Sequence, residues 1–460
     1  MHSLAALTPY LPLIVGAVLA LALVYARKRV PAALVTLMIT AFVDMVGVLM
    51  VFPLLPFYAK SLGGNGVDVP LGVAGRSYHL DIGVIVAALV AAFTAAQLVS
   101  APLWGRFSDR FGRRPALLVA LASSVGGYLV FAFANSLGLL FLSRLVQGAG
   151  GGTTGVIQAY VADATPPDQR AKSLGWLSAA TNLGVALGPV LGSWASALGE
   201  QRIPLGGTAT LHMGTAAPGL MAALLCVVNM AFAWSFLRES RDTGEHRAAI
   251  AAGRKPGTSR QAIARVVTRS GEPASRLIWI YAVAIGAFQG TTGFLSLFLA
   301  SKFGVTERTI GIFFGYVGGI SVIMRAVVLG PAVDSFGEAR LSRAGTALLA
   351  LGLATLPFAP TVWWLALPVA LLPIGTAFTF PCVTALLSRV INPGERGLYM
   401  GVQQAFGGIS RVIFPFVLGF AYDRLGRGYP FWISATFVAA TILLGLGMEG
   451  YTKPKPVVAA

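Results

Sequence analysis

The sequence predicts an all-α membrane protein made of two related six-helix bundles and one extra N-terminal transmembrane helix. Its composition is the first observation, since 56% of the 460 residues are hydrophobic and only 11% are charged. Soluble domains are usually about 45–50% apolar and about 25% charged, and they need polar surface to cover their core. The second observation is a series of long apolar runs, and the third is a pair of motifs that recurs in the second half of the chain.

Thirteen segments are predicted to span the membrane, because each is apolar over roughly the length that a helix needs to cross the hydrocarbon core. The first carries no Lys or Arg before residue 27, so it lacks the positive start of a signal peptide and is predicted to be retained. An amphipathic interfacial helix is the alternative, although residues 11–25 show no polar face. In chain order the segments lie near 8–26, 32–59, 81–104, 115–134, 138–164, 173–198, 216–237, 277–300, 308–331, 341–359, 362–389, 398–422 and 429–449.

The basic residues predict the orientation of the chain. Cytoplasmic loops are rich in Lys and Arg, which places residues 27–29 and the loop 105–115 on the cytoplasmic side. Most of the 34 Lys and Arg residues then fall on that side, with the N-terminus outside and the C-terminus cytoplasmic. Topology and attraction to anionic lipid headgroups therefore explain the net charge of +17. Because the basic residues are spread over separate short loops, no nucleic-acid partner is expected.

Two motifs repeat at nearly the same offset, which predicts two equivalent halves. "GRFSDRFGRR" (105–114) is echoed by "GPAVDSFGEA" (330–339), and "PPDQRAKSLG" (166–175) by "NPGERGLYMG" (392–401), at separations of 225 and 226 residues. The predicted parts are an N-terminal helix (1–30), a six-helix bundle (31–237), a cytoplasmic linker (238–276), a second six-helix bundle (277–452) and a tail (453–460).

Ionisable residues deep inside spans are the best functional candidates, because they are costly unless they face a cavity or a partner. Four stand out: Asp44, Arg144, Arg325 and Arg411. Asp44 lies near the middle of its span, where loss of hydration favours the protonated carboxyl and suits reversible proton binding. A permanent structural ion pair with an Arg is the alternative.

Several polar residues are predicted to line a central cavity. Arg144, Gln147 and Gln158 fall within an arc of about 60° on one helical face, and Gln404 and Arg411 also share a face. For Arg144, the alternative is a position near the outer membrane boundary, with the side chain reaching toward water. For the amides, hydrogen bonding between helices is an equal alternative. The cavity candidates are Gln97, Gln147, Gln158, Asn182, Gln289, Arg325, Gln404 and Arg411.

Two glycine-containing stretches carry further signals. In the loop 105–115, Gly105 and Gly112 are predicted to allow tight backbone paths at helix ends, and Asp109 lies among four arginines that could lock one conformation. A plain basic anchor is the alternative. In "GVALGPVLG", the residues Gly184, Gly188 and Gly192 form a ridge of small residues that lets another helix approach closely, and Pro189 removes a backbone donor.

Enzymatic signals are absent from the sequence. Cys226 and Cys382 both fall in predicted spans without metal-type spacing, and no glycine-rich loop ends in Gly-Lys-Ser/Thr. "GAGGG" (148–152) lies inside a span and predicts close helix packing. Neither a catalytic site, a metal site nor a cofactor is expected, and an ion gradient is the expected energy source.

These motifs resemble the major facilitator superfamily. "GRFSDRFGRR" matches the family's loop signature Gly-x3-Asp-Arg-x-Gly-Arg/Lys-Arg/Lys. Three stretches are similar to the drug:proton antiporter branch with twelve core helices, which includes the tetracycline exporters: "FVDMVGVLMVFPLLPFYA" (42–59), "LSRLVQGAGGGTTGVIQAYVADATPPDQRA" (142–171) and "GVALGPVLGS" (184–193). The resemblance implies the major facilitator fold and a bacterial inner membrane.

The resemblance also implies residue roles. Asp44 and Arg144 match family positions linked to proton coupling, and the glycine stretch matches an antiporter motif formed by Gly184, Gly188, Pro189 and Gly192. A conformational latch between the two halves is implied for Gly105, Asp109, Arg110, Gly112, Arg113, Arg114 and Asp163.

The chain departs from tetracycline exporters at several positions. Gly127-Tyr128 replaces an Asp-Tyr pair, Ser321 stands for a His, and Arg325 stands for a Gln. Tetracycline itself is therefore not the expected substrate. In the second-half loop, Ser335, Glu338 and Ala339 replace three arginines, so the loop charges are interpreted as lost.

The resulting expectation is a secondary transporter that exports small amphipathic or drug-like compounds in exchange for protons by alternating access. Its expected partners are the small-molecule cargo, protons and the lipid bilayer, and a monomer is expected. A proton-coupled or passive importer of a metabolite or lipid is the first alternative. A non-transporting sensor or scaffold that docks a partner through the first helix is the second, and a membrane enzyme is the least favoured.

Overall fold

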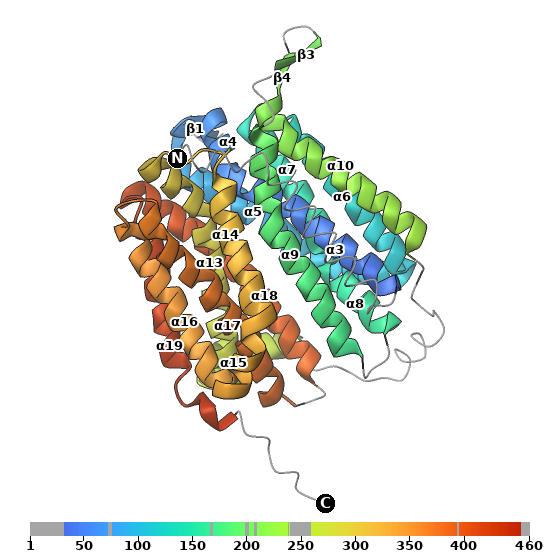
Figure 1. Cartoon of the computed structure of the whole chain (residues 1–460), viewed down its shortest axis with the longest axis vertical. Coiled ribbons are helices and arrows are strands. Elements are labelled where there is room, and N and C mark those ends of the chain that lie inside the picture. The colour runs from blue at the N-terminus through green and yellow to red at the C-terminus, as the bar shows by residue number, and fades with distance from the viewer. Residues whose placement is uncertain are drawn as a thin grey trace, which may run out of the picture. The chain divides into compact units, whose positions relative to one another are not determined.

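The computed structural model describes residues 32–71, 76–165, 169–197, 202–206, 209–237, 239, 259–392 and 395–451 (Figure 1). The predicted span 8–26, most of the predicted linker and the C-terminal tail lie outside these residues. As far as they are described, the residues form two compact units. Unit 1 comprises Met1–Thr243 with Gly293–Val322, and unit 2 comprises Gly244–Thr292 with Ile323–Ala460. The predicted boundaries of the two bundles stay a prediction.

Long apolar helices make up both units, which confirms the predicted helical membrane fold. Most helices of unit 1 precede the predicted linker: α3 (Ala32–Val51), α4 (Leu55–Gly63), α5 (Ile82–Phe111), α6 (Arg113–Ala132), α7 (Leu137–Gly150), α8 (Thr154–Ala164), α9 (Arg170–Ala197) and α10 (Met213–Phe236). Helix α13 (Pro273–Phe303) passes from unit 2 into unit 1, and α14 (Ile310–Ile323) ends where the chain returns to unit 2. The remaining helices belong to unit 2: α12 (Ser259–Thr268), α15 (Leu329–Phe336), α16 (Glu338–Thr355), α17 (Ala366–Val390), α18 (Arg396–Arg424) and α19 (Tyr429–Leu444).

Within the described part, ten helices are long and apolar enough to cross a membrane. Two other predicted spans are helical but differ from the prediction, since one is divided and the other is shorter. The span predicted at 138–164 is divided into α7 and α8 by the 3-10 turn η3 (Gly151–Thr153), and the last span is the 16-residue helix α19. The run "GAGGG" therefore packs closely, as predicted, but also interrupts the helix: a Cβ added at Gly150 would lie 3.0 Å from the carbonyl oxygen of Ala120.

Short breaks divide other spans as well. The 3-10 turn η2 (Phe52–Leu54), which contains Pro53, separates α3 from α4, and a π-helical turn, η4 (Met324–Val328), lies between α14 and α15. Pro53 removes a backbone donor at its break. The π turn contains Arg325, and such turns are frequent at functional sites.

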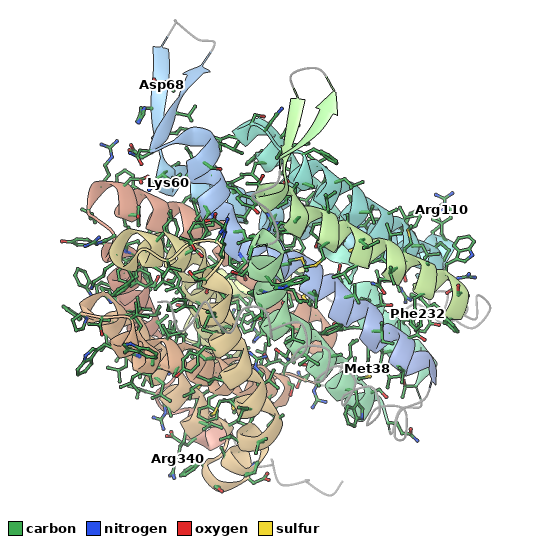
Figure 2. All side chains as sticks on the ribbon, turned by 45° about the horizontal axis from the view of Figure 1, so that its top comes forward. Met38, Lys60, Asp68, Arg110, Phe232 and Arg340 are labelled. Atoms are coloured by element: carbon green, nitrogen blue, oxygen red, sulfur yellow. The ribbon has the colours of Figure 1, made fainter. Side chains whose placement is uncertain are left out.

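Two β-hairpins replace what the sequence analysis treated as loops. Strand β1 (Gly66–Leu71) pairs antiparallel with β2 (Arg76–Asp81), with Gly66 opposite Asp81, and β3 (Arg202–Gly206) pairs with β4 (Ala209–His212). In Figure 2, Asp68 of β1 and Lys60 lie toward one end of unit 1, whereas Arg110 and Phe232 lie toward the opposite end.

The glycine ridge predicted on α9 packs against α3, the helix that carries Asp44. A Cβ added at Gly184 would lie 2.5 Å from the carbonyl oxygen of Phe42, and one at Gly188 would lie 2.8 Å from that of Val46. A Cβ at Gly192 would meet the backbone of Met50. The predicted close helix approach is thus confirmed, and α9 runs unbroken through Pro189.

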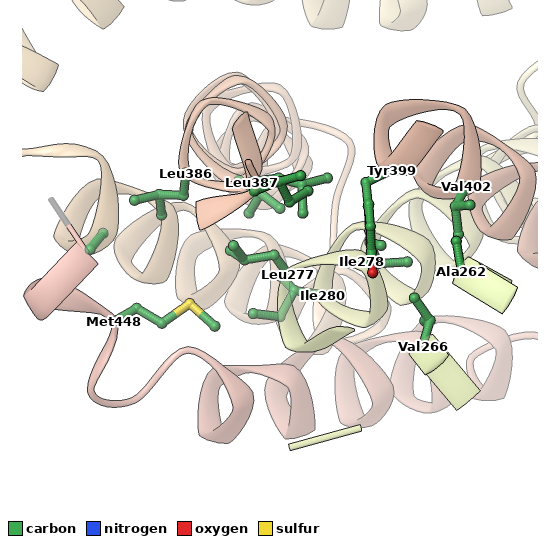
Figure 3. Close-up of a cluster of buried hydrophobic side chains, with 13 residues drawn as sticks. Ala262, Val266, Leu277, Ile278, Ile280, Leu386, Leu387, Tyr399, Val402 and Met448 are labelled. Carbon is green, nitrogen blue, oxygen red and sulfur yellow. The ribbon is translucent and has the colours of Figure 1, made fainter. Parts of the chain in front are cut away.

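The core of unit 2 also holds the amphipathic helix α12. Ala262 and Val266 pack among buried residues of α13, α17 and α18, such as Ile278 and Tyr399 (Figure 3). Arg265 donates to Glu272 (Nε to Oε2, 2.7 Å) just before α13 begins, and this hydrogen bond lowers the pKa of the Glu272 carboxyl from its usual value. The pair fixes the chain where it enters the first spanning helix after the linker.

Candidate functional site

Asp44 lies on α3 and is buried, with 6% of its surface exposed. Among the described residues its carboxyl group makes no hydrogen bond or ion pair, so the alternative of a permanent pair with an Arg is not found there. A buried carboxyl without a partner is costly in its charged form. The group can therefore change its charge without breaking a protein contact.

Arg144 on α7 is fully buried rather than reaching toward water. Its Nη1 donates to Oε1 of Gln147 (2.5 Å), and the guanidinium lies over the ring of Phe93, 4.6 Å from the centroid. Gln147 in turn donates to the carbonyl oxygen of Gly127 (3.1 Å). Nε and Nη2 of Arg144 have no hydrogen-bond partner among the described residues, so the cation is held in place with one edge unsatisfied.

Tyr128 packs against α3, because a Cβ added at Gly47 would lie 2.8 Å from its hydroxyl oxygen, and the sequence analysis did not assign it a role. Its ring is buried on α6, and its hydroxyl interacts electrostatically with both Asp44 and Arg144. Asp44 also interacts with the thiol of Cys226 on α10. In the sequence, Tyr128 was marked only by the glycine before it. The structure shows why that residue is small: a Cβ at Gly127 would lie 2.6 Å from Cγ of Gln147.

In unit 2 a second polar group surrounds Tyr281 of α13. Arg325 and Arg411 both interact electrostatically with Tyr281, and Gln404 donates to its hydroxyl (3.4 Å). Arg411 also donates through Nε to the carbonyl oxygen of Gly407 (3.2 Å). We call Tyr281, Arg325, Gln404 and Arg411 the Tyr281 cluster. The sequence analysis had placed Gln404 and Arg411 on one helical face. It did not predict that Tyr281 or Arg325 belongs with them.

The remaining predicted cavity residues do not join either group. Gln97 donates to the carbonyl oxygen of Gly151 (2.9 Å) and Asn182 to that of Ser178 (2.7 Å), so both bond to backbone. Gln158 lies on α8, beyond the interruption at η3, and is exposed, which removes it from the face of Arg144. Gln289 is half-buried on α13 and makes no hydrogen bond within the described chain.

The motif at 105–115 forms two helix ends joined at Gly112 rather than a loop. Helix α5 continues to Phe111, so the predicted helix-end role of Gly105 is wrong: it lies inside the helix with open space around it. Gly112 has φ 104°, a conformation that favours glycine, and separates α5 from α6. Arg113 donates to Asp109 (3.0 Å) and to Ser108 (2.6 Å).

Glu239, which follows α10, completes this cluster and was missed from the sequence. Its two carboxylate oxygens accept from the backbone amides of Arg113 (2.9 Å) and Arg114 (3.1 Å), the first two residues of α6. Arg114 donates to the carbonyl oxygen of Trp234 (2.6 Å) near the end of α10. All these contacts lie within unit 1, and the latch between halves stays a prediction. Asp163 lies on α8, but its side chain is outside the described residues.

We expect Glu239→Gln to lower the apparent melting temperature of the purified protein in detergent. A carboxylate that caps a helix N-terminus contributes about 0.5–2 kcal/mol through its hydrogen bonds and the helix dipole. Glu395→Gln is the matched control, because Glu395 stands at the N-terminus of α18 but makes no side-chain cap bond. Equal melting temperatures for the two variants would contradict the capping role.

The second-half counterpart of this motif carries an ion pair whose two residues have the opposite charges to those at the matching positions of the first half. Arg389 donates to the carboxylate of Glu338, the first residue of α16. At the repeat offsets of 225 and 226 residues, Glu338 corresponds to Arg113 and Arg389 to Asp163. The interpretation that the loop charges are lost is therefore corrected for Glu338: here the sign of the charge is reversed and the residue is paired.

The described residues include no group of three or more His, Cys, Asp or Glu side chains placed to hold a metal ion. Inside its spans, unit 1 carries the Asp44 carboxyl and the Arg144 guanidinium, and unit 2 carries the guanidiniums of Arg325 and Arg411.

The sequence matches the family model of the Major Facilitator Superfamily over residues 37–329 and 277–459. The chain belongs to the Major Facilitator Superfamily. Members of this superfamily are membrane transporters, not enzymes in general, and move small substrates, often together with protons. This chain is accordingly a multi-pass membrane transporter protein.

Individual relatives confirm the predicted resemblance to the tetracycline-exporter branch of the superfamily. The chain is 29% identical over 402 residues to the class C tetracycline resistance protein of Escherichia coli, covering 85% of this chain and 89% of that protein. It is 26% identical to multidrug resistance protein 2 of Bacillus subtilis (strain 168), covering 92% and 95%. The crystal structure of a D-xylose–proton symporter shares the major facilitator fold, with a TM-score of 0.70 at 16% identity, covering 92% of this chain and 99% of the other.

Proposed function

We propose that this transporter exports small amphipathic, drug-like compounds across the inner membrane in exchange for protons, by alternating access. The observation that carries the proposal is the buried Asp44 carboxyl, which has no bonded partner among the described residues and shares Tyr128 with the buried Arg144. Asp44 is the proton-binding group in this proposal, and Arg144 is the fixed charge that responds to it.

The chemistry follows from the two charge states of Asp44. When Asp44 is ionised, its negative charge and the positive charge of Arg144 both act on Tyr128; when Asp44 is protonated, only the charge of Arg144 does. Each state therefore favours a different arrangement of the surrounding helices, because a buried charge without compensation is costly. Proton binding shifts the equilibrium between inward and outward forms only by this difference.

Two observations support export rather than import. Two relatives that match most of this chain in sequence are resistance proteins, one for tetracycline in Escherichia coli and one a multidrug resistance protein in Bacillus subtilis (strain 168). The antiporter-type motif of α9 also packs directly on α3 around Asp44, through Gly184 and Gly188. Movement of α9 would therefore reach the proton-binding helix without an intermediate element.

The test is compound-driven proton movement in proteoliposomes that contain a pH-sensitive dye. Tetraphenylphosphonium, 2-naphthoate and tetracycline are added one at a time across an imposed pH gradient, with protein-free liposomes as the control. Antiport predicts that protons move opposite to the compound, with little response to tetracycline. Protons that move with the compound would instead support the importer. The absence of any compound-dependent flux would contradict transport and favour a sensor or scaffold.

A further inference from the structure

One face of α3 is polar and buried up to the turn of Asp44. Thr36, Thr40 and Asp44 follow one another at intervals of four residues, and each has at most 6% of its surface exposed. Residues four apart lie one above the other on the same face of a helix. Val46, about 200° around α3 from Asp44, lies instead against Gly188 of α9. The polar face of α3 is therefore not the face that α9 covers.

Asn229 of α10 packs on this polar face at the turn of Asp44. Its side chain is buried, with 2% of its surface exposed, and Nδ2 donates to the carbonyl oxygen of Thr40 (3.3 Å). In an α-helix the same carbonyl accepts from the backbone amide four residues later, so the Asn229 amide lies beside the turn from Thr40 to Asp44. Because side chains on a helix lean toward its N-terminus, the Asp44 carboxyl leans toward this turn.

The partner of Asn229 fixes the orientation of its amide. A backbone carbonyl only accepts hydrogen bonds, so the amide nitrogen must face Thr40 and the amide oxygen must point elsewhere. This Oδ1 is buried and has no hydrogen-bond partner among the residues that the structure describes. A buried acceptor without a donor is unfavourable. An ionised Asp44 cannot satisfy it, because a carboxylate only accepts, whereas a protonated carboxyl carries one donor.

Two further titratable side chains lie near this stretch of α3. Tyr128 of α6 faces the next turn, since a Cβ added at Gly47 would lie 2.8 Å from its hydroxyl oxygen. Cys226 precedes Asn229 by about one turn of α10 and is fully buried. The buried cation Arg144 lies on α7, stacked on an aromatic ring of α5. A hydroxyl and a thiol carry donors of their own, so Oδ1 of Asn229 is the acceptor here that needs a donor from elsewhere.

We propose that Oδ1 of Asn229 accepts a hydrogen bond from the protonated Asp44 carboxyl, directly or through one bound water, and so stabilises the proton-loaded state. Asn229 is a positioning residue in this proposal, which rests on the proposed function only in that Asp44 takes up and releases a proton. When the proton leaves, the carboxylate and Oδ1 are both acceptors, and the hydrogen bond is lost. Proton release therefore weakens the contact between α3 and α10 at this turn.

The test is infrared difference spectroscopy of the full chain in nanodiscs, titrated from acid to alkaline pH without cargo. Subtraction of the Asp44→Asn spectra assigns the carboxyl stretching band of protonated Asp44. In wild type this band is expected at the lowered frequency of a hydrogen-bonded acid. Asn229→Leu keeps nearly the same side-chain shape but removes the acceptor, so it is expected to raise the frequency. It is also expected to move half-protonation of Asp44 to lower pH by at least about half a unit, or about 0.7 kcal/mol, because only the protonated form loses a bond.

Ser235→Ala is the matched control, because Ser235 is an exposed polar residue on another face of α10 and donates to the carbonyl oxygen of Ala231 (2.9 Å). It is expected to change neither the frequency nor the midpoint. An unchanged band in Asn229→Leu would overturn the proposal.

The wild-type spectrum decides even if Asn229→Leu fails to fold. A band at the frequency of a free carboxylic acid would show that protonated Asp44 has no acceptor, and would overturn the proposal. Because no cargo is added, a failure of transport leaves this result unchanged. An Asp44 band that is absent at every pH would instead refute the proton site itself, so the two proposals fail in distinguishable ways.

Discussion

Asp44→Asn is expected to abolish compound-driven proton movement in proteoliposomes, reducing it to the level of protein-free liposomes. Asn has nearly the shape of a protonated Asp but cannot release or take up a proton. Because Asp44 makes no hydrogen bond or ion pair among the described residues, its replacement removes no protein contact. The variant is therefore expected to fold with an apparent melting temperature equal to or above that of wild type.

A counterflow assay distinguishes loss of proton coupling from loss of cargo binding in the Asp44→Asn variant. Exchange of labelled cargo for unlabelled cargo requires no net proton movement, so Asp44→Asn is expected to retain it. Asp68→Asn is the control, because Asp68 is an exposed carboxylate on the hairpin β1–β2, where it pairs with His79 (3.0 Å). Undiminished proton movement in Asp44→Asn would remove Asp44 from the coupling role while leaving the transporter itself in place.

Gly192→Ala and Gly188→Ala are expected to destabilise the protein strongly. The added methyl group would meet backbone atoms of α3, the carbonyl oxygen of Val46 at Gly188 and the Met50 backbone at Gly192. A backbone carbonyl cannot rotate away as a flexible side chain can, so α9 must shift away from α3. Overpacking of this kind costs about 1–3 kcal/mol, and the clash at Gly192 places it at the upper end. The measurement is the apparent melting temperature and the yield of monodisperse protein.

Gly175→Ala supplies a control on the same helix. Gly175 lies in α9 with no atom within 4 Å of an added Cβ, so the substitution gains only helix propensity. It is expected to leave the melting temperature unchanged or slightly raised. If Gly192→Ala proved as stable as Gly175→Ala, close packing of α9 on α3 would not be what the glycine ridge provides. Transport is also expected to fall in Gly188→Ala, since α3 carries Asp44.

The helices and the candidate charges could be predicted because both depend on local sequence. Apolar length identifies a membrane span, and Asp44, Arg144, Arg325 and Arg411 stand out since charge is rare there. The errors concern helix ends, where a helix continues through a residue that usually ends helices or stops within an apolar segment. At Gly105 helix α5 runs past a glycine, and at Gly151 helix α7 gives way to the 3-10 turn η3.

The partners of the charges could not be predicted, since they come from segments far apart in the chain. Glu239 caps α6 although it lies well over a hundred residues away, and nothing in its own surroundings marks it. The motif already singled out Arg113. Its backbone contact with the Glu239 carboxylate at the start of α6 could not be predicted, because the two residues are distant in the sequence. The ion pair between Arg389 and Glu338 could not be predicted for the same reason.

The sequence by itself determined the membrane-spanning helices, the repeat at 225 and 226 residues and the family signatures, because periodicity, hydrophobicity and motif spacing are properties of short stretches. Only the tertiary structure decided that Tyr128 packs against α3, the helix of Asp44, and that Gln404 of α18 bonds to Tyr281 of α13. The physical reason is that helices present only part of their surface to each neighbour. Which polar residues meet therefore depends on how the helices pack, through contacts such as the glycine ridge of α9 on α3.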